Sequence, residues 1–146
     1  MKVLLQRVKK ASVRIGNELH SEIGYGILIF VGVEKNDTDS QAEFLANKVC
    51  NLRIFEDEIG KMNLSVKDVG GEILIVSQFT LAANCKKGTR PSFDNAMEPL
   101  AANHIYENFV SFVKGNNISL KTGVFGAMMD IELVNDGPVT FILTKE

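Results

Sequence analysis

The apolar run Ile27-Leu28-Ile29-Phe30-Val31-Gly32-Val33 constrains the fold of this chain more than any other segment. It offers no polar side chain to water and is rich in β-branched residues, a pattern typical of a central strand that is buried on both faces. Other elements must therefore pack against each side of this strand.

Two segments have the periodicity and the end signals of covering helices. The first is expected from about Asp39 to Leu52, with Thr38 as N-cap and Gln41 as its capping-box partner. The second is expected to begin at Pro99, run to Lys114 and end at Gly115-Asn116. Each carries an apolar stripe, formed by Ala42, Leu45, Val49 and Leu52 in the first and by Ala102, Tyr106, Phe109 and Val113 in the second.

Segments of strand character account for most of the remaining chain: residues 1–8, 11–15, 19–23, 72–78, 118–121, 129–134 and 139–144. Gly16-Asn17 is expected to form a tight turn, and the polar residues 56–61 a solvated hairpin tip. With 146 residues, 45% of them apolar, the chain fits one domain, residues 1–146, around one core. The predicted class is α/β, mostly β-sheet with two main covering helices.

The composition excludes several kinds of protein. A net charge of -2 argues against nucleic-acid binding over a broad cationic surface, because that mode requires many phosphates to be neutralised. Cys50 and Cys85 are far apart in sequence and lack the spacing of a disulfide framework or a zinc site. No signal peptide and no membrane-spanning segment is expected, and we expect a cytoplasmic protein.

Familiar catalytic groups are also missing. The two histidines, His20 and His104, sit in no motif and are expected at the surface, so a Ser-His-acid triad is not indicated. The histidines, cysteines and carboxylates show no ligand spacing, and we expect no metal. There is no Walker sequence, and Gly24-Tyr25-Gly26 lacks the rest of a dinucleotide fingerprint. We therefore expect no cofactor.

Catalysis by backbone dipoles is compatible with this chain. The tract Ser77-Gln78-Phe79-Thr80-Leu81 ends an apolar run, where the N–H groups of Phe79 and Thr80 could hold the developing oxyanion of an ester under attack. A hydroxyl is a weak nucleophile without a base, which favours a positioning role for Thr80 over covalent attack. Covalent attack by Thr80 is the alternative.

A second tract, Asn135-Asp136-Gly137-Pro138-Val139-Thr140, precedes the last apolar segment. A Gly-Pro peptide bond can be cis at modest cost, although only about 5–6% of X-Pro bonds in folded proteins are. On its own, Gly137-Pro138 would usually be a trans turn.

The order of sequence blocks resembles the D-aminoacyl-tRNA deacylase family nearly end to end. Besides the two tracts above, the matching blocks are Gln6-Arg7-Val8, Ala11-Ser12-Val13, Asn51-Leu52-Arg53-Ile54-Phe55, Gly60-Lys61-Met62-Asn63, Arg90-Pro91-Ser92-Phe93 and Thr122-Gly123-Val124-Phe125-Gly126. The resemblance implies a three-layer fold. It also implies hydrolysis of D-aminoacyl-tRNA, with Ser77, Gln78, Phe79 and Thr80 as catalytic residues and the ribose 2′-OH of the substrate in place of a side-chain base.

The resemblance further implies a homodimer with two composite sites. In similar deacylases a cis Gly-Pro from one subunit enters the partner's pocket and excludes an L side chain, and Gly137 and Pro138 match that motif. Glycine has no side chain to exclude, so glycyl-tRNA, including tRNA-Ala mischarged with glycine, is an expected substrate. Arg7 looks like the arginine that braces this segment. The alternative interpretation is that Arg7 is an exposed charge on a strand.

Phe125 resembles a residue that forms a wall of the pocket in this family. The alternative interpretation is that Phe125 simply packs in the core. Lys86, Lys87 and Arg90 form a basic stretch that could hold acceptor-stem phosphates, although a solvated loop is the common explanation. The chain departs from the family pattern at Ala82, Asn84 and Met128, which concerns RNA affinity or loop order more than the chemistry. Two further hypotheses are a non-catalytic RNA-binding module and a small hydrolase that uses Cys85 as its nucleophile.

Overall fold

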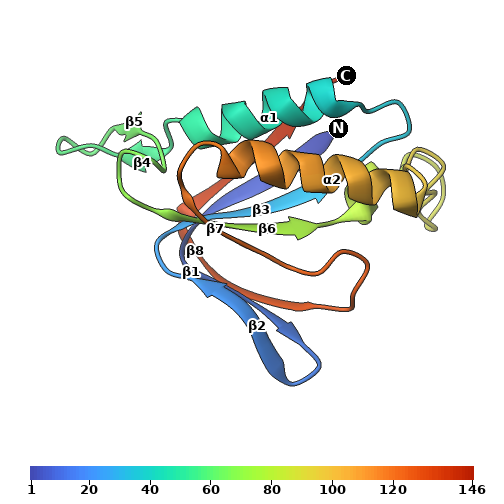
Figure 1. The fold of residues 1–146 in the computed structure, drawn as a ribbon, viewed down its shortest axis with the longest axis horizontal. Helices are drawn as coiled ribbons and strands as arrows, with labels where there is room; N and C mark the ends of the chain where they lie inside the picture. Colours follow the sequence, from blue (N-terminus) through green and yellow to red (C-terminus); the bar gives the residue numbers. More distant parts are fainter.

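The computed structural model describes residues 1–146 and is built on one six-stranded sheet (Figure 1). The strand order is β2 (Glu18–Ile23), β1 (Lys2–Ile15), β3 (Gly26–Gly32), β6 (Glu72–Ser77) and β7 (Ser119–Thr122), and β8 (Asp130–Thr144) pairs with β1. The helices are α1 (Asp39–Asn51) and α2 (Pro99–Lys114). A short hairpin, β4 (Phe55–Glu56) and β5 (Met62–Leu64), projects from the connection after α1.

Both expected helices are confirmed, together with their end signals. Thr38 caps α1 in a capping box with Gln41, and these residues are expected to contribute about 1 kcal/mol to its stability. Pro99 opens α2, and the Glu98 side chain caps it by accepting from the N–H groups of Leu100 and Ala101. Neither helix is long and apolar enough to cross a membrane.

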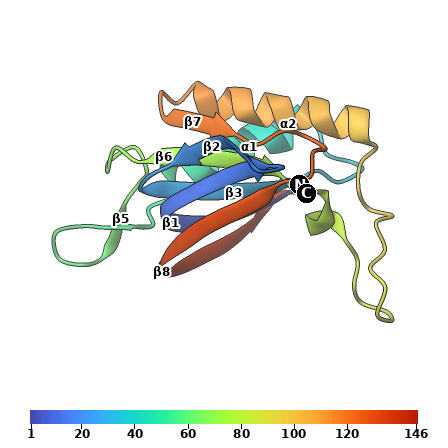
Figure 2. The same cartoon turned by 90° about the horizontal axis from the view of Figure 1, so that it is seen from below.

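The central strand is buried on both faces, as expected, but the two helices do not take one face each. Both helices pack on the same face, where Ile27 and Ile29 of β3 belong to the larger core cluster (Figure 1). Leu28 points to the other face, into a second cluster with Val8, Ala11, Val13, Ile23, Leu74 and Val76. Parts of β1, β2 and β8 therefore cover the second face, and the three layers are helices, central sheet and these curled strands (Figure 1). Figure 2 shows the same strands from below.

β8 corrects a second expectation, because the two strands expected at residues 129–134 and 139–144 are one continuous strand, Asp130–Thr144. Its pairing with β1 changes register sharply: Gln6 pairs with Thr140, whereas Val8 pairs with Asn135. The residues between Asn135 and Thr140 therefore bulge out of the strand. Gly137-Pro138 lies in this bulge, its peptide bond is cis, and Gly137 has a φ of 128°, a region that favours glycine.

The topology brings three strand ends together. β3 pairs in parallel with β6, and β6 in parallel with β7, so their carboxyl ends lie on one edge of the sheet. The connections between them run through α1 and α2, as parallel pairing requires. Loops at such an edge are the usual place for a ligand site in an α/β sheet.

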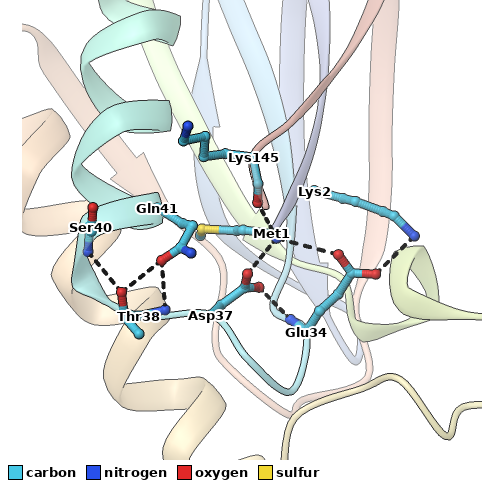
Figure 3. Close-up of polar contacts among 8 residues, drawn as sticks. All are labelled: Met1, Lys2, Glu34, Asp37, Thr38, Ser40, Gln41 and Lys145. Carbon is cyan, nitrogen blue, oxygen red and sulfur yellow. Dashed lines mark hydrogen bonds and ion pairs between the residues drawn. The ribbon is translucent and has the colours of Figure 1, made fainter.

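Met1 joins the amino end of β1 and the carboxyl end of β8 to the loop before α1 (Figure 3). The amino nitrogen of Met1 lies 2.5 Å from Asp37 Oδ1 and 3.3 Å from Glu34 Oε2, and it donates to the carbonyl of Lys145 at 2.9 Å. Lys2 Nζ contacts the other carboxylate oxygen of Glu34 at 3.0 Å. Burial raises the pKa of Glu34, but its bonds to Lys2 and the amino group lower it more.

Candidate active site

An apolar cleft of about 470 Å³ opens at the carboxyl ends of β3 and β6. Four groups of residues line it: Val31, Val33, Val76 and Ser77 at the ends of β3 and β6; Gln78 and Phe79 after β6; Met97, Pro99 and Ala102 before and within α2; and Phe125, Gly126, Ala127, Met128, Met129 and Ile131 before and within β8. Four predicted site residues, Ser77, Gln78, Phe79 and Phe125, thus line one cavity.

The tract after β6 forms a single 3-10 turn, η1 (Phe79–Ala82). The N–H of Gln78 donates to the carbonyl of Val31 at 2.7 Å and so extends the pairing with β3 by one residue. Leu81 and Ala83 donate to the carbonyls of Gln78 and Thr80. The N–H groups of Phe79 and Thr80 are the first of the turn and have no acceptor inside it.

Gly32 allows this turn to lie against the end of β3. A Cβ atom on Gly32 would stand 2.7 Å from the Cβ of Leu81 and 3.1 Å from the carbonyl oxygen of Gln78. Both distances are shorter than ordinary contacts, so a larger residue would displace the turn.

The Thr80 hydroxyl has a polar partner, and that partner is not a base. Gln78 Nε2 donates to Thr80 Oγ1 at 2.5 Å. A carboxamide cannot accept the proton of a nucleophilic hydroxyl at neutral pH, so the contact orients Thr80 without activating it. Thr80 is exposed and, unlike its three predecessors, is not among the residues that line the cleft.

Phe125 is half-buried and packs against α2. Its ring centroid lies 5.7 Å from that of Tyr106, whose hydroxyl donates to the carbonyl of Ile75 at 3.2 Å. Burial raises the pKa of Tyr106, so its hydroxyl stays protonated and acts as a donor. The N–H of Gly123 donates to the same Ile75 carbonyl at 2.9 Å, which holds the loop leading to Phe125 on the end of β6.

Arg7 is 4% exposed, so the interpretation as an exposed strand charge is wrong. Its Nη1 donates to the carbonyl of Ile54 at 2.7 Å. Its Nε lies 3.3 Å from the carbonyl oxygen of Asp136 and 3.1 Å from the Asp136 carboxylate, and its Nη2 lies 3.9 Å from Glu56. The guanidinium thus contacts the residue directly before Gly137.

Gly137 and Pro138 are exposed and do not line the cleft. Along β1 the bulge lies opposite Arg7, near the beginning of β3, whereas the cleft lies beyond the end of β3. One copy of the chain therefore holds the two predicted parts of the site apart.

The basic residues Lys86, Lys87 and Arg90 are exposed in the loop between η1 and α2. Asn84 and Ser92 close this loop with two backbone hydrogen bonds of 2.7 and 3.0 Å. Phe93 then packs on Phe79, with 5.0 Å between ring centroids, so the loop is anchored at the cleft.

Cysteine chemistry finds no support in the cleft. Cys85 is exposed in the basic loop and does not line the cavity. Cys50 is buried in α1, and burial raises the pKa of its thiol to about 11, which keeps it protonated and unreactive. His20 and His104 are exposed, as expected. No group of three or more His, Cys, Asp or Glu side chains is placed to hold a metal ion.

Sequence reasoning missed several contributors to these two places. Met97 and Met129 line the cleft, as does Met128, which is 90% exposed and was noted in the sequence only as a departure from the family pattern. Their apolar character carried no signal, because methionine is common in cores. Asp136 was hidden inside the Asn135–Thr140 motif, where only Gly137-Pro138 drew attention, although an acidic neighbour is a natural partner for Arg7.

The fold and the cleft define a small α/β protein with an apolar cleft at the carboxyl edge of its sheet. The family model described as D-Tyr-tRNA(Tyr) deacylase matches residues 4–144. The D-aminoacyl-tRNA deacylase of Thermodesulfovibrio yellowstonii is 59% identical over 143 residues, which cover 98% of each chain. The chain therefore belongs to the D-Tyr-tRNA(Tyr) deacylase family, a family of hydrolases that act on the ester bond of aminoacyl-tRNA.

Solved structures agree on the fold. A structure titled "c-Myc DNA Unwinding Element Binding Protein" superposes with a TM-score of 0.94 at 42% identity, covering 100% of this chain and 99% of that one. A probable eukaryotic D-amino acid tRNA deacylase superposes with a TM-score of 0.85 over 97% of both chains, at 17% identity. The second likeness concerns the fold alone.

Proposed function

We propose that this chain hydrolyses the ester bond of D-aminoacyl-tRNA and releases a free D-amino acid and intact tRNA. The observation that carries the proposal is the 3-10 turn at the cleft, whose first two N–H groups, on Phe79 and Thr80, have no acceptor within the turn. The names of the curated relatives support the substrate class. The non-catalytic RNA-binding alternative is disfavoured by membership of a hydrolase family.

In the proposed reaction, the aminoacylated 3′ end of tRNA enters the cleft and water attacks the ester carbonyl carbon. The N–H groups of Phe79 and Thr80 stabilise the negative charge that develops on the carbonyl oxygen, and such stabilisation is often the largest single catalytic effect. The new C–O bond forms to water, the bond to the ribose 3′ oxygen breaks, and that oxygen takes a proton. The neighbouring ribose 2′-OH orients the water, which would explain why the site has no side-chain base.

Discrimination between D and L substrates is assigned to Gly137 and Pro138 of a second copy. Two observations support this assignment: the bulge is exposed, and it lies outside the cleft of its own chain. Next to the bulge, β8 presents the apolar side chain of Ile142, 67% exposed, which a second copy would cover. Main-chain carbonyls in such a position would hold the α-amino group, so that an L side chain collides while many D side chains pass.

Two further properties follow from this proposal. Glycine offers no side chain to exclude, so glycyl-tRNA, including tRNA-Ala mischarged with glycine, should also be cleaved. Lys86, Lys87 and Arg90 would contact acceptor-stem phosphates, since their loop is anchored beside the cleft by Phe93. The proposed substrate, tRNA, supports a cytoplasmic location as part of the same proposal.

Matched D-tyrosyl-, L-tyrosyl- and glycyl-tRNA test the proposed activity. We expect release of D-tyrosine and glycine, and little or no release of L-tyrosine. Equal cleavage of both tyrosyl enantiomers would refute the role of the bulge. Binding of all three without ester loss would refute hydrolysis.

A mixing experiment tests the composite site. A variant impaired in the turn, Gly32→Ala, and a variant impaired in the bulge, Gly137→Ala, are each unfolded and then refolded together. If each site uses the turn of one copy and the bulge of the other, half of the dimers regain one of two sites, and about a quarter of the parent activity returns. No recovery beyond that of the separate variants, with dimers present by light scattering, would place both parts in one chain.

A further inference from the structure

We propose that Asp136 is a positioning residue that sets the preference for D over L substrates, because it holds Arg7 against the Gly137-Pro138 bulge. This inference rests on the proposed function of the bulge. It adds the residue Asp136, which in the proposed reaction contacts neither the cleft nor Gly137 of a second copy.

The first argument is charge. The Arg7 side chain is almost completely buried, and a buried guanidinium without a carboxylate partner is strongly destabilising. Within 4.0 Å it has two such partners, Asp136 at 3.1 Å and Glu56 at 3.9 Å. The Asp136 side chain is 22% exposed and that of Glu56 is 59% exposed, so water weakens the second ion pair far more. Asp136 is therefore the main counter-charge.

The second argument is geometry. Arg7 Nε faces both the carboxylate and the main-chain carbonyl of Asp136, at 3.1 and 3.3 Å. The Asp136 side chain thereby aligns its own peptide group, which joins directly to Gly137. A Cβ atom on Gly137 would lie 3.3 Å from Arg7 Nη2, so the guanidinium is also packed against the bulge. Since Nη1 donates to the carbonyl of Ile54, Arg7 connects the bulge both to its own strand β1 and to the segment between α1 and β4.

The third argument is that the bulge has separate supports at its ends. Asn135 Oδ1 accepts from the N–H of Val139 at 3.1 Å, and Asn135 Nδ2 donates to Thr140 Oγ1 at 3.0 Å. Gln6 Nε2 donates to the same hydroxyl at 3.2 Å. These bonds close the bulge without Asp136, so loss of the Asp136 charge should let the bulge move without unfolding it.

The isosteric variant Asp136→Asn tests the inference, with the parent, Asp136→Glu and Glu132→Gln measured beside it. Glu132 is a matched control, because it pairs with Arg14 at 3.5 Å between the same two strands, but in an exposed position. We expect Asp136→Asn to keep its fold and to lower the ratio of kcat/KM for D- over L-tyrosyl-tRNA at least about tenfold. Asp136→Glu should restore part of the ratio, and Glu132→Gln should leave it unchanged.

An unchanged ratio in Asp136→Asn would overturn the inference. An equal loss on both substrates would also overturn it, because Asp136 would then only support the fold. If the parent itself failed to prefer the D substrate, the proposed function would fail instead, so the two failures are distinguishable.

Discussion

Gln78 Nε2 and Thr80 Oγ1 lie 2.5 Å apart, and the amide donates to the hydroxyl. Thr80 carries the one hydroxyl in the turn that is a candidate nucleophile. Its partner in this contact is an amide N–H, which cannot accept the proton of the hydroxyl. The contact favours a role of the Thr80 side chain in shaping the turn over a role as nucleophile. In the proposed reaction, only the backbone N–H of Thr80 acts on the substrate.

Thr80→Ala should therefore keep substantial activity. The variant loses one side-chain hydrogen bond, worth about 0.5–1.5 kcal/mol, and kcat should fall at most roughly tenfold. Single-turnover hydrolysis of D-tyrosyl-tRNA measures this directly. A loss of activity as large as that expected for Gly32→Ala, in which the turn is displaced, together with an acyl-enzyme trapped in the parent, would show that Thr80 is the nucleophile.

Gly32→Ala should impair catalysis more than folding. The added methyl group would stand 2.7 Å from Leu81 Cβ, and the turn must shift to relieve this contact. A displacement of about 1 Å can cost about 10²-fold in rate, whereas overpacking costs about 1–3 kcal/mol of stability. Gly24→Ala is the matched control, because its Cβ would meet only Glu72 Oε1, at an ordinary 3.5 Å. Full activity in Gly32→Ala would contradict the need for a close turn.

Neutralising the basic loop should weaken tRNA binding without changing the chemical step. Replacing Lys86, Lys87 or Arg90 by Gln removes one phosphate contact in each case, and the slope of log KM against log salt should fall by about 1. Single-turnover rates at saturating tRNA should stay at the parent value. Lys48→Gln, an exposed change on α1, serves as the control. Identical salt slopes in all variants would remove the loop from the RNA interface.

Stability should depend on pH through Glu34. Its folded pKa lies below the ordinary 4.5, because its bonds to Lys2 and the amino group outweigh the opposing effect of burial. A lowered folded pKa gives stability that is present above pH 4.5 and is lost as the pH falls through the folded value. Urea unfolding from pH 6 to pH 3 should therefore show a smaller loss in Glu34→Gln than in the parent.

The dependence of stability on pH that remains in Glu34→Gln should come from other carboxyls with lowered pKa values. Asp57 accepts from the backbone N–H of Lys61, and Asp68 from the backbone N–H of Ser65. Glu43→Gln is the control, since the exposed Glu43 forms no ion pair. An equal pH dependence in Glu34→Gln and the parent would contradict the assignment.

Local signals in the sequence were sufficient for the helices and most strands. The Thr38–Gln41 capping box and Pro99 set the helix starts through contacts within a few residues, which a sequence pattern records directly. The side on which the helices pack was not recorded in this way. It depends on β1 and β8 curling over Leu28, and that contact joins residues distant in sequence.

The lining of the cleft was predictable where a motif carried it and not where packing made it. The tract Ser77-Gln78-Phe79 was singled out because a strand end presents backbone donors, and Phe125 through the family resemblance. All four line the cleft, and their catalytic or binding roles stay predictions. The methionines of the cleft and the counter-charge Asp136 become visible only when α2 and β8 are in place. Gly137-Pro138 looked like a turn between two strands, since a proline usually interrupts pairing, whereas the bulge lets β8 continue past it.

The contrast between the two cysteines offers a practical benefit. Because the Cys50 side chain of α1 is buried in the core, a maleimide fluorophore would attach to Cys85 alone, in the loop that carries Lys86 and Arg90. Emission from that dye would report the arrival of an RNA acceptor stem in real time, in a chain whose own cysteines need no engineering.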